Sequence, residues 1–344
     1  MDGLSASSTV GRVSETDRSR PRRRRPFRKA VGLVVLLGVI GYFVVQRESD
    51  NGAPYCTASA TGAAGSAGAG DVQTYEMTPE QAANAATIAA VGISKGLPDR
   101  AVTIALATAM QESALRNLDH GDRDSLGLFQ QRPSQGWGTP EQIMDPVYSA
   151  GIFYDRLAEI KGYTRLPLTV AAQKVQLSGF PQAYAKHEPD ATVLTAAFGE
   201  NGTPASLVCS GPAPSAGDPE KVRAELVRAF GAPAREALGG GRAGAPAGRP
   251  GSPGGSVPEA EVGLRLKEGG GPAEARRGRA MAHWAVARSK ELGIARVSYD
   301  GSSWTAGRDG GSWRGKGGGR KSGADPHDAA PGEVRIFLAR TTAR

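Results

Sequence analysis

The sequence predicts a mainly α-helical central domain, preceded by a single transmembrane helix and followed by a small C-terminal α/β module. Residues 30–45 form an apolar run without charge, and apolar residues recur at helical spacing over 76–209. Residues 272–344 combine a helical pattern with short runs of β-branched and aromatic residues. Segments 46–75 and 210–271 are rich in Gly, Ala, Ser or Pro and are predicted to be flexible linkers.

Composition and charge divide the 344-residue chain in the same way. Only 39% of the residues are apolar and 48 are Gly, which predicts long segments without a packed core. Basic and acidic residues number nine and three in residues 1–29, eleven and seventeen in 30–209, and twenty-two and fourteen in 210–344. An acidic middle therefore lies between two basic ends.

The apolar run at residues 30–45 (AVGLVVLLGVIGYFVV) would be about 24 Å long as a helix, against a hydrocarbon core of about 30 Å. Basic flanking side chains can extend it, and no small-x-small cleavage pattern follows, so we expect an uncleaved signal anchor. The basic cluster at 22–29 predicts that the tail, residues 1–29, is cytoplasmic. The chain is thus expected to be a single-pass plasma membrane protein with its bulk outside the cytoplasm. This topology explains the basic run without a nucleic-acid partner, and a single span disfavours transport.

Two cysteines, Cys56 and Cys209, bracket the central domain. Outside the cytoplasm a bridge between them would tie the ends of the domain together. Closing a loop of this length contributes about 3–5 kcal/mol in the chain-entropy model. The alternative is two unpaired thiols. Neither cysteine has a second Cys or a His at ligand spacing, so we expect no metal site and no cofactor.

Helix signals run through the central domain. Residues 78–81 (TPEQ) form a capping box with Pro at the first helical position, and this helix should end near Lys95. The next helix carries the apolar stripe Val102, Leu106 and Met110. A second capping box opens a helical region at residues 139–142, and further helices are expected at 145–160, 168–177 and 181–197.

A motif follows the apolar stripe. Glu112 and Ser113 end that helix, and residues 127–130 (GLFQ) come after a loop rich in Asp and Gly, with Gln130 eighteen positions after Glu112. This arrangement resembles the soluble lytic transglycosylases and goose-type lysozymes, in which an E-S pair ends a buried helix and a G-L-M-Q-like turn lines the cleft. The resemblance covers about a third of the chain. It implies a lysozyme-like fold for residues 76–209 and peptidoglycan glycan strands as the partner.

The resemblance gives each residue of the motif a role. Glycosidic cleavage needs a proton at the leaving oxygen, and a buried Glu112 with a raised pKa would supply it. Ser113 would orient the site, Gly127 would let the backbone approach the sugar, and Gln130 would offer a donor and an acceptor. Trp137, in the next loop, is a candidate platform for sugar stacking.

The implied activity is a membrane-anchored lytic transglycosylase that cleaves MurNAc–GlcNAc bonds. By the resemblance, one Glu acts first as acid and then as base, while the N-acetyl group assists and the C6 hydroxyl attacks. Asp122 or Asp124 as a second carboxylate would instead make the protein a hydrolase. The alternative is that Asp122 and Asp124 are solvated surface charges on either side of Arg123.

One departure from the family leaves a second function open. The family carries an A-Y-N type motif, but this chain has Ala171-Ala172-Gln173 without the Tyr-Asn pair. A non-catalytic peptidoglycan-binding or scaffold protein is therefore the alternative. Tyr184 is one aromatic residue that would replace the missing one, although its helical spacing favours a place in the core.

The C-terminal module is predicted to contain a helix near 273–292 and strands at 295–299 and 334–338. Asp300-Gly301 is a hairpin-turn signal, and three tryptophans can build a small core. The excess positive charge of this part favours anionic wall polymers as a further partner. A third hypothesis is that the chain's function lies in this module.

Overall fold

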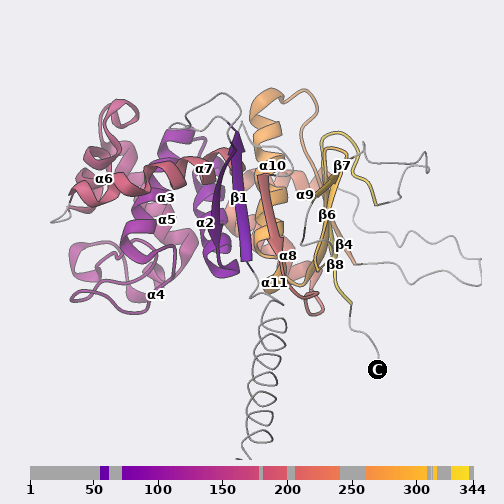
Figure 1. Ribbon diagram of the computed structural model, residues 1–344, viewed down its shortest axis with the longest axis horizontal. Coiled ribbons are helices and arrows are strands. Elements are labelled where there is room, and N and C mark those ends of the chain that lie inside the picture. Colours follow the sequence, from indigo (N-terminus) through magenta and orange to yellow (C-terminus); the bar gives the residue numbers. More distant parts are fainter. Residues whose placement is uncertain are drawn as a thin grey trace, which may run out of the picture. The chain divides into compact units, whose positions relative to one another are not determined.

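The computed structural model defines two sheets and the helices around them (Figure 1). All structural statements concern the part of the chain that the structure describes. These residues are 55–61, 72–177, 181–199, 206–240, 260–307, 311, 313–315 and 327–340.

A three-stranded antiparallel sheet stands beside the helical region. Its strands are β1 (Tyr55–Thr61), β2 (Val72–Met77) and β3 (Leu207–Ser210), in the order β2-β1-β3. Both β1 and the start of β2 fall within 46–75, so the prediction of a flexible linker over that whole range is wrong. The small side chains of β1 alternate between buried and exposed positions, and the strand packs on α7. Its composition resembles a spacer, but its period of two is that of a strand.

The helical half follows the predicted pattern closely. The capping boxes at Thr78 and Thr139 are both formed, with the side-chain and backbone hydrogen bonds of the motif. The helices are α2 (Pro79–Ser94), α3 (Asp99–Ser113), α4 (Pro140–Ile143), α5 (Pro146–Glu159), α6 (Leu168–Gln176) and α7 (Glu188–Phe198), with short 3-10 helices η1 (Pro133–Gln135), η2 (Tyr163–Arg165) and η3 (Pro181–His187).

The C-terminal half contains a five-stranded antiparallel sheet in the order β4-β8-β5-β6-β7. The strands are β4 (Glu261–Arg265), β5 (Ile294–Tyr299), β6 (Ser302–Thr305), β7 (Trp313–Gly315) and β8 (Glu333–Leu338), and the helices are α8 (Pro219–Phe230), α9 (Ala232–Gly240), α10 (Gly271–Ala287) and α11 (Ser289–Leu292). Three of these elements, α8, α9 and β4, lie in the predicted linker 210–271. The amphipathic pattern of α8 buries Val222, Leu226 and Phe230, which a linker would leave exposed.

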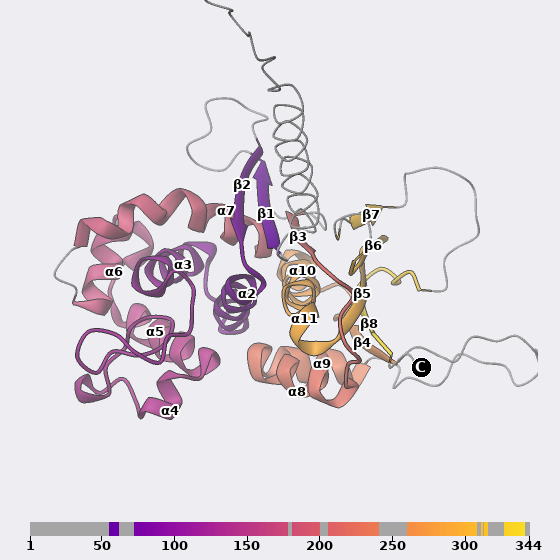
Figure 2. The ribbon, with the colours of Figure 1, turned by 60° about the horizontal axis from the view of Figure 1, so that its bottom comes forward.

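The two halves are packed together as one compact unit. Helix α10 lies between α2 and the five-stranded sheet (Figure 2). From α10, Arg276 forms an ion pair with Asp99 at the start of α3 and donates to the Leu97 carbonyl at 3.0 Å. Arg279 donates to the Gly199 carbonyl at 2.6 Å. These polar contacts fix the register between the halves.

The predicted fold class is therefore wrong. The chain is not a mainly α domain with a separate small module, because two sheets and their helices share one α/β unit. None of the helices in the described part of the chain has the length and apolar character needed to cross a bilayer. The predicted transmembrane segment, residues 30–45, and the basic tail, residues 1–29, lie outside the described residues.

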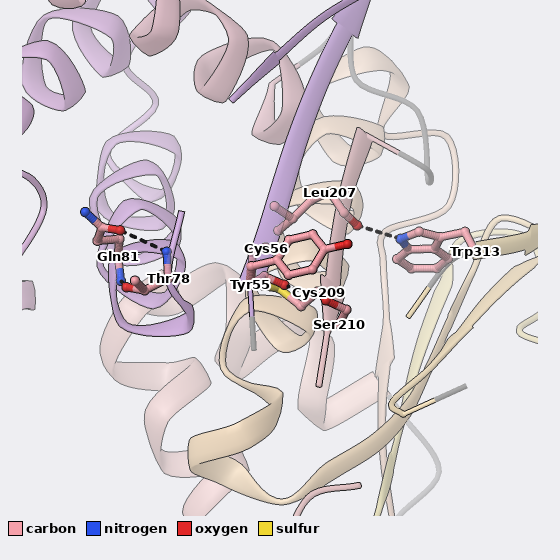
Figure 3. Close-up of a disulfide and its surroundings, with 8 residues drawn as sticks. All are labelled: Tyr55, Cys56, Thr78, Gln81, Leu207, Cys209, Ser210 and Trp313. Atoms are coloured by element: carbon pink, nitrogen blue, oxygen red, sulfur yellow. Dashed lines mark hydrogen bonds between the residues drawn. A yellow bond between two sulfur atoms is a disulfide. The ribbon is translucent and has the colours of Figure 1, made fainter. Parts of the chain in front are cut away.

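The predicted disulfide is confirmed. Cys56 and Cys209 are register partners on β1 and β3, with their Cα atoms 4.0 Å apart and a sequence separation of 153. Both side chains are buried. Figure 3 shows the bridge between the two strands. On the outer side of β3, the Trp313 indole donates to the Leu207 carbonyl at 2.8 Å. The bridge and this contact hold β3 between the helical half and the C-terminal sheet.

Candidate functional site

Glu112 lies in the last turn of α3, and the end of that helix is fixed by α2. Ala114 and Leu115 both adopt the left-handed conformation, at φ 51° and 60°. This conformation costs a residue with a Cβ about 1–2 kcal/mol. Gln81 Nε2 donates to the Ala114 carbonyl at 2.9 Å and Asn84 Nδ2 to the Leu115 carbonyl at 2.8 Å. The strained turn is thus held by two hydrogen bonds from α2, and Glu112 has a defined position.

Ser113 connects the end of α3 to the turn at residues 127–130. Its hydroxyl donates to the Leu128 carbonyl at 2.8 Å, in a buried position. Gly127 has φ 76°, and a Cβ at that position would lie 2.7 Å from the Ile143 carbonyl oxygen. The glycine is therefore required by packing against α4, which accounts for it without any approach to a sugar. The predicted residues Glu112, Ser113 and Gly127 are brought together.

The carboxyl group of Glu112 faces the segment around η3. Tyr184 is fully buried, and its hydroxyl donates to Glu112 Oε1 at 2.6 Å. Burial raises the pKa of Glu112 above its ordinary value, and this effect exceeds the opposing effects of the hydrogen bonds from Tyr184 and Gln176. Tyr184 is therefore a site residue, although its helical spacing indicates a core position.

Gln176, at the end of α6, is a site residue that the sequence analysis missed. Its Nε2 donates to the Phe129 carbonyl at 2.7 Å, and its side chain acts to lower the pKa of Glu112. Ser113 and Gln176 thus bind the adjacent carbonyls of Leu128 and Phe129. In the sequence Gln176 is one polar residue in an amphipathic helix, and nothing in the spacing marks it out.

Gln130 is bound mostly to its own loop. Its backbone has φ 48°, and its Nε2 donates to the His120 carbonyl at 3.3 Å and the Gly127 carbonyl at 3.4 Å. A Cβ on Gly121 would lie only 1.8 Å from Gln130 Oε1. Glycine at position 121 therefore leaves space for the side-chain amide of Gln130. The observed contacts of Gln130 therefore stabilise the loop.

The two Asp residues of the loop have different surroundings. Asp122 has a side chain that is 93% exposed, with the Arg123 guanidinium 3.9 Å away. Asp124 accepts from the Ser134 backbone N–H at 2.9 Å and from Arg132 Nε at 2.7 Å. These donors, Ser134 first, hold the pKa of Asp124 well below its usual range. Neither Asp hydrogen-bonds to Glu112 in the described part of the chain.

Trp137 differs from its predicted role as a sugar platform. Its side chain is 6% exposed, and the Arg156 guanidinium lies 3.5 Å from the ring centroid. Arg156 also donates to the Gly136 carbonyl at 2.9 Å. A guanidinium stacked on the ring occupies the surface on which a sugar would stack, so Trp137 anchors its loop.

Comparison with known proteins adds no family to this description. No protein-family model matches the chain, and no curated protein matches it significantly. The features that bear on function are therefore the motif around Glu112 and the contacts that its carboxyl group makes.

Proposed function

We propose that this protein is a peptidoglycan lytic transglycosylase that cleaves MurNAc–GlcNAc bonds with Glu112 as its single acid and base. The observation that carries the proposal is a buried carboxyl group with a raised pKa, oriented by the Tyr184 hydroxyl at 2.6 Å. The resemblance of Glu112, Ser113 and residues 127–130 to the lytic transglycosylase motif supplies the reaction.

In the first step the neutral form of Glu112 donates its proton to the glycosidic oxygen, and the bond from that oxygen to the anomeric carbon breaks. Burial favours the neutral form at a pH where an exposed Glu would be ionised. The N-acetyl group of the MurNAc residue assists from the opposite side of the ring. The leaving GlcNAc departs as an alcohol, and Glu112 is left as the carboxylate.

In the second step the carboxylate of Glu112 accepts the proton of the sugar's own C6 hydroxyl. The C6 oxygen then forms a bond to the anomeric carbon as the bond from the N-acetyl oxygen to that carbon, made in the first step, breaks. The product has a 1,6-anhydro end, the N-acetyl group is restored, and Glu112 returns to its acid form. The hydrogen bonds from Tyr184 and Gln176 favour the ionised form, so they assist this step. No second carboxylate is needed in this mechanism. This agrees with the hydrogen bonds that Arg132 and Ser134 donate to Asp124, because they bind its carboxylate within the loop.

A non-catalytic glycan-binding protein is the second candidate. Two observations favour it: within the described residues the Gln130 side chain donates to carbonyls of its own loop alone, and the Trp137 ring is stacked with Arg156. The absence of the A-Y-N motif adds to them. Against it, a protein that only binds glycan has no need of a buried carboxyl group with a raised pKa.

The disulfide between Cys56 and Cys209 supports a location outside the cytoplasm, where such bridges persist. Peptidoglycan is found in that compartment. The excess of basic residues after residue 209 supports an additional attraction to anionic wall polymers.

The experiment is digestion of purified peptidoglycan by the full chain and by Glu112→Gln, with products read by mass spectrometry. Anhydro-muropeptides from wild type, reduced about 10²- to 10⁴-fold in Glu112→Gln, are the expected result. Asp122→Asn is the matched control and should cleave like wild type. Reducing ends would instead indicate a hydrolase, and retained glycan binding without any product from wild type would favour the non-catalytic protein.

A further inference from the structure

Segment η3 is attached to the end of α3 by two side-chain contacts. The first is the hydrogen bond from the Tyr184 hydroxyl to Glu112 Oε1, at 2.6 Å. In the second, His187 Nε2 lies 3.2 Å from Gln111 Oε1. Gln111 and Glu112 are consecutive in the chain, and residues three apart in a 3-10 helix lie on the same side of it. The pair of Gln111 and His187 therefore lies beside the proposed acid.

The two contacts differ in their exposure. Tyr184 is fully buried, whereas Gln111 and His187 are both half-buried, so their side chains reach the solution. His187 is also the N-cap residue of α7, but its side chain makes no capping hydrogen bond. Within the part of the chain that the structure describes, the contact between the two is the one hydrogen bond that either side chain makes. Both side chains therefore keep polar atoms that a ligand can use.

The contact between the two side chains fixes which atoms remain available. The amide oxygen Gln111 Oε1 can only accept, so His187 Nε2 carries the proton. Burial, and after it the charge of Lys186, lowers the pKa of His187 below its ordinary value, against an opposing effect of Asp190. The imidazole is therefore neutral at pH 7, and its Nδ1 is an acceptor. Because Gln111 Nε2 keeps both of its N–H groups, donors and an acceptor lie side by side.

A ligand that matches this pair presents a carbonyl oxygen next to a hydroxyl group. The GlcNAc that leaves in the proposed reaction has this arrangement, because its C2 acetamido group and its C3 hydroxyl are neighbours. The C3 hydroxyl is also adjacent to the glycosidic oxygen at C4, which receives the proton of Glu112 in that reaction. MurNAc carries an ether at C3 and has no hydroxyl to donate there. The chemistry of the pair therefore favours GlcNAc over MurNAc.

We propose that Gln111 and His187 bind the leaving GlcNAc residue. A Gln111 N–H donates to the acetamido carbonyl, and the C3 hydroxyl donates to His187 Nδ1. In this position the C4 oxygen of the same sugar lies next to Glu112, so the pair positions the bond that is cleaved. This inference rests on the proposed function, because that function makes GlcNAc the leaving group.

The first test follows the imidazole nitrogens of His187 by NMR in the full chain labelled with ¹⁵N-histidine. Glu112→Gln is used so that the probe, the GlcNAc trimer, stays intact, and the His187 signals are assigned by their loss in His187→Phe. Without ligand, Nε2 should carry the proton. With excess trimer the Nδ1 signal should move, while the signals of His327, which contacts Phe337 of the C-terminal sheet, should stay in place. A proton on Nδ1, or an Nδ1 signal that does not move, would overturn the proposal.

The second test measures whether Gln111 recognises the acetamido group, and it does not depend on the folding of His187→Phe. Calorimetry gives the affinity for the GlcNAc trimer relative to the N-deacetylated glucosamine trimer, again in the Glu112→Gln background. Adding Gln111→Leu should lower this ratio about two- to tenfold, as for loss of one neutral hydrogen bond. Gln73→Leu, at a half-buried Gln on β2, is the matched control and should keep the ratio. An unchanged ratio in Gln111→Leu would show that its amide does not bind the carbonyl, and the proposal would fail.

Both tests measure binding, so their outcome is separable from that of the proposed function. A His187 signal that responds to the trimer, in a protein whose wild type yields no anhydro-muropeptides, would retain the GlcNAc site and refute the transglycosylase. Anhydro-muropeptides from wild type, together with a His187 signal that does not respond, would retain the enzyme and refute the GlcNAc site.

Discussion

Glu112 and Asp124 are acidic residues in the same stretch of chain, but their surroundings shift the pKa values of their carboxyl groups in opposite directions. Glu112 ends a buried helix, where the loss of water raises its pKa despite the donors that face it. Asp124 stands in an open loop, where Ser134 and Arg132 donate directly to both of its oxygens and lower its pKa. One is therefore suited to carry a proton and the other to remain ionised.

The comparison shows that spacing alone does not decide which carboxyl group does chemistry. Both residues are acidic, and both lie near the GLFQ turn. What distinguishes them is where their hydrogen-bond donors come from. The donors to Asp124 belong to its own loop and fix its shape. The hydroxyl that donates to Glu112 comes from Tyr184 in η3, an element distant in the sequence, and Gln176 of α6 lowers the pKa of the same carboxyl group.

Among changes that leave the Glu112 carboxyl group in place, the largest effect should come from removing the hydroxyl that orients it. Tyr184→Phe should lower kcat about tenfold or more, since a hydrogen bond to a charged group is worth about 1.5–3 kcal/mol. It should also raise the pKa of Glu112, because a donor to the carboxylate is lost. The alkaline limb of the pH profile would then move upward.

The control for this prediction is Tyr148→Phe, on α5, which should change neither the rate nor the pH profile. A Tyr184→Phe protein with a lower rate but an unmoved pH profile would show that the hydroxyl supports the fold without acting on Glu112.

An intermediate effect concerns stability. A buried acid with a raised pKa favours the native state below its unfolded pKa, and this contribution is lost as pH rises through the folded value. Glu112→Gln should therefore raise the free energy of unfolding at pH 7, by an amount on the order of 1 kcal/mol. The gain should shrink as the pH is lowered through the folded pKa. Urea unfolding of both proteins at several pH values measures this gain in the free energy of unfolding. A gain that does not change with pH would show that the raised pKa of Glu112 does not affect stability.

The smallest effect should come from the loop. Asp124 contributes stability that is present above its unfolded pKa and lost as pH falls through its lower folded value. Asp124→Asn should speed hydrogen exchange at the Ser134 amide several-fold at pH 7, while Asp122→Asn leaves it unchanged. Equal exchange in both variants would mean that Asp124 does not hold this loop.

The sequence predicts local structure better than long-range contacts. Capping boxes at Thr78 and Thr139 locate helix starts because they act over three residues. The bond between Tyr184 and Glu112 spans 72 residues, and no local pattern encodes it. The Glu112 motif was recognised because the resemblance supplied its spacing, whereas Gln176 had no such signal.

The error in the fold class has a physical cause. After Tyr55 and Cys56, strand β1 consists of Ala, Ser and Thr, a composition typical of a spacer. Its alternate residues are nevertheless buried, the strand packs on α7, and Cys56 forms the disulfide. Likewise, α8 and β4 lie in a segment dominated by Gly and Pro. In both places a short segment with the periodicity of a strand or a helix packs against elements that are distant in the sequence. The average composition of the segment does not reveal such packing.

The most direct test of the account is the titration of these two carboxyl groups in one protein. In the full chain with ¹³C-labelled Glu and Asp side chains, NMR can follow the chemical shifts of the carboxyl carbons against pH. The signals of the two residues are assigned by their loss in Glu112→Gln and Asp124→Asn. We expect Glu112 to titrate above the ordinary value of 4.5 for Glu, and Asp124 to titrate below the ordinary value of 3.8 for Asp. A Glu112 that titrates at or below its ordinary value would contradict its role as the acid.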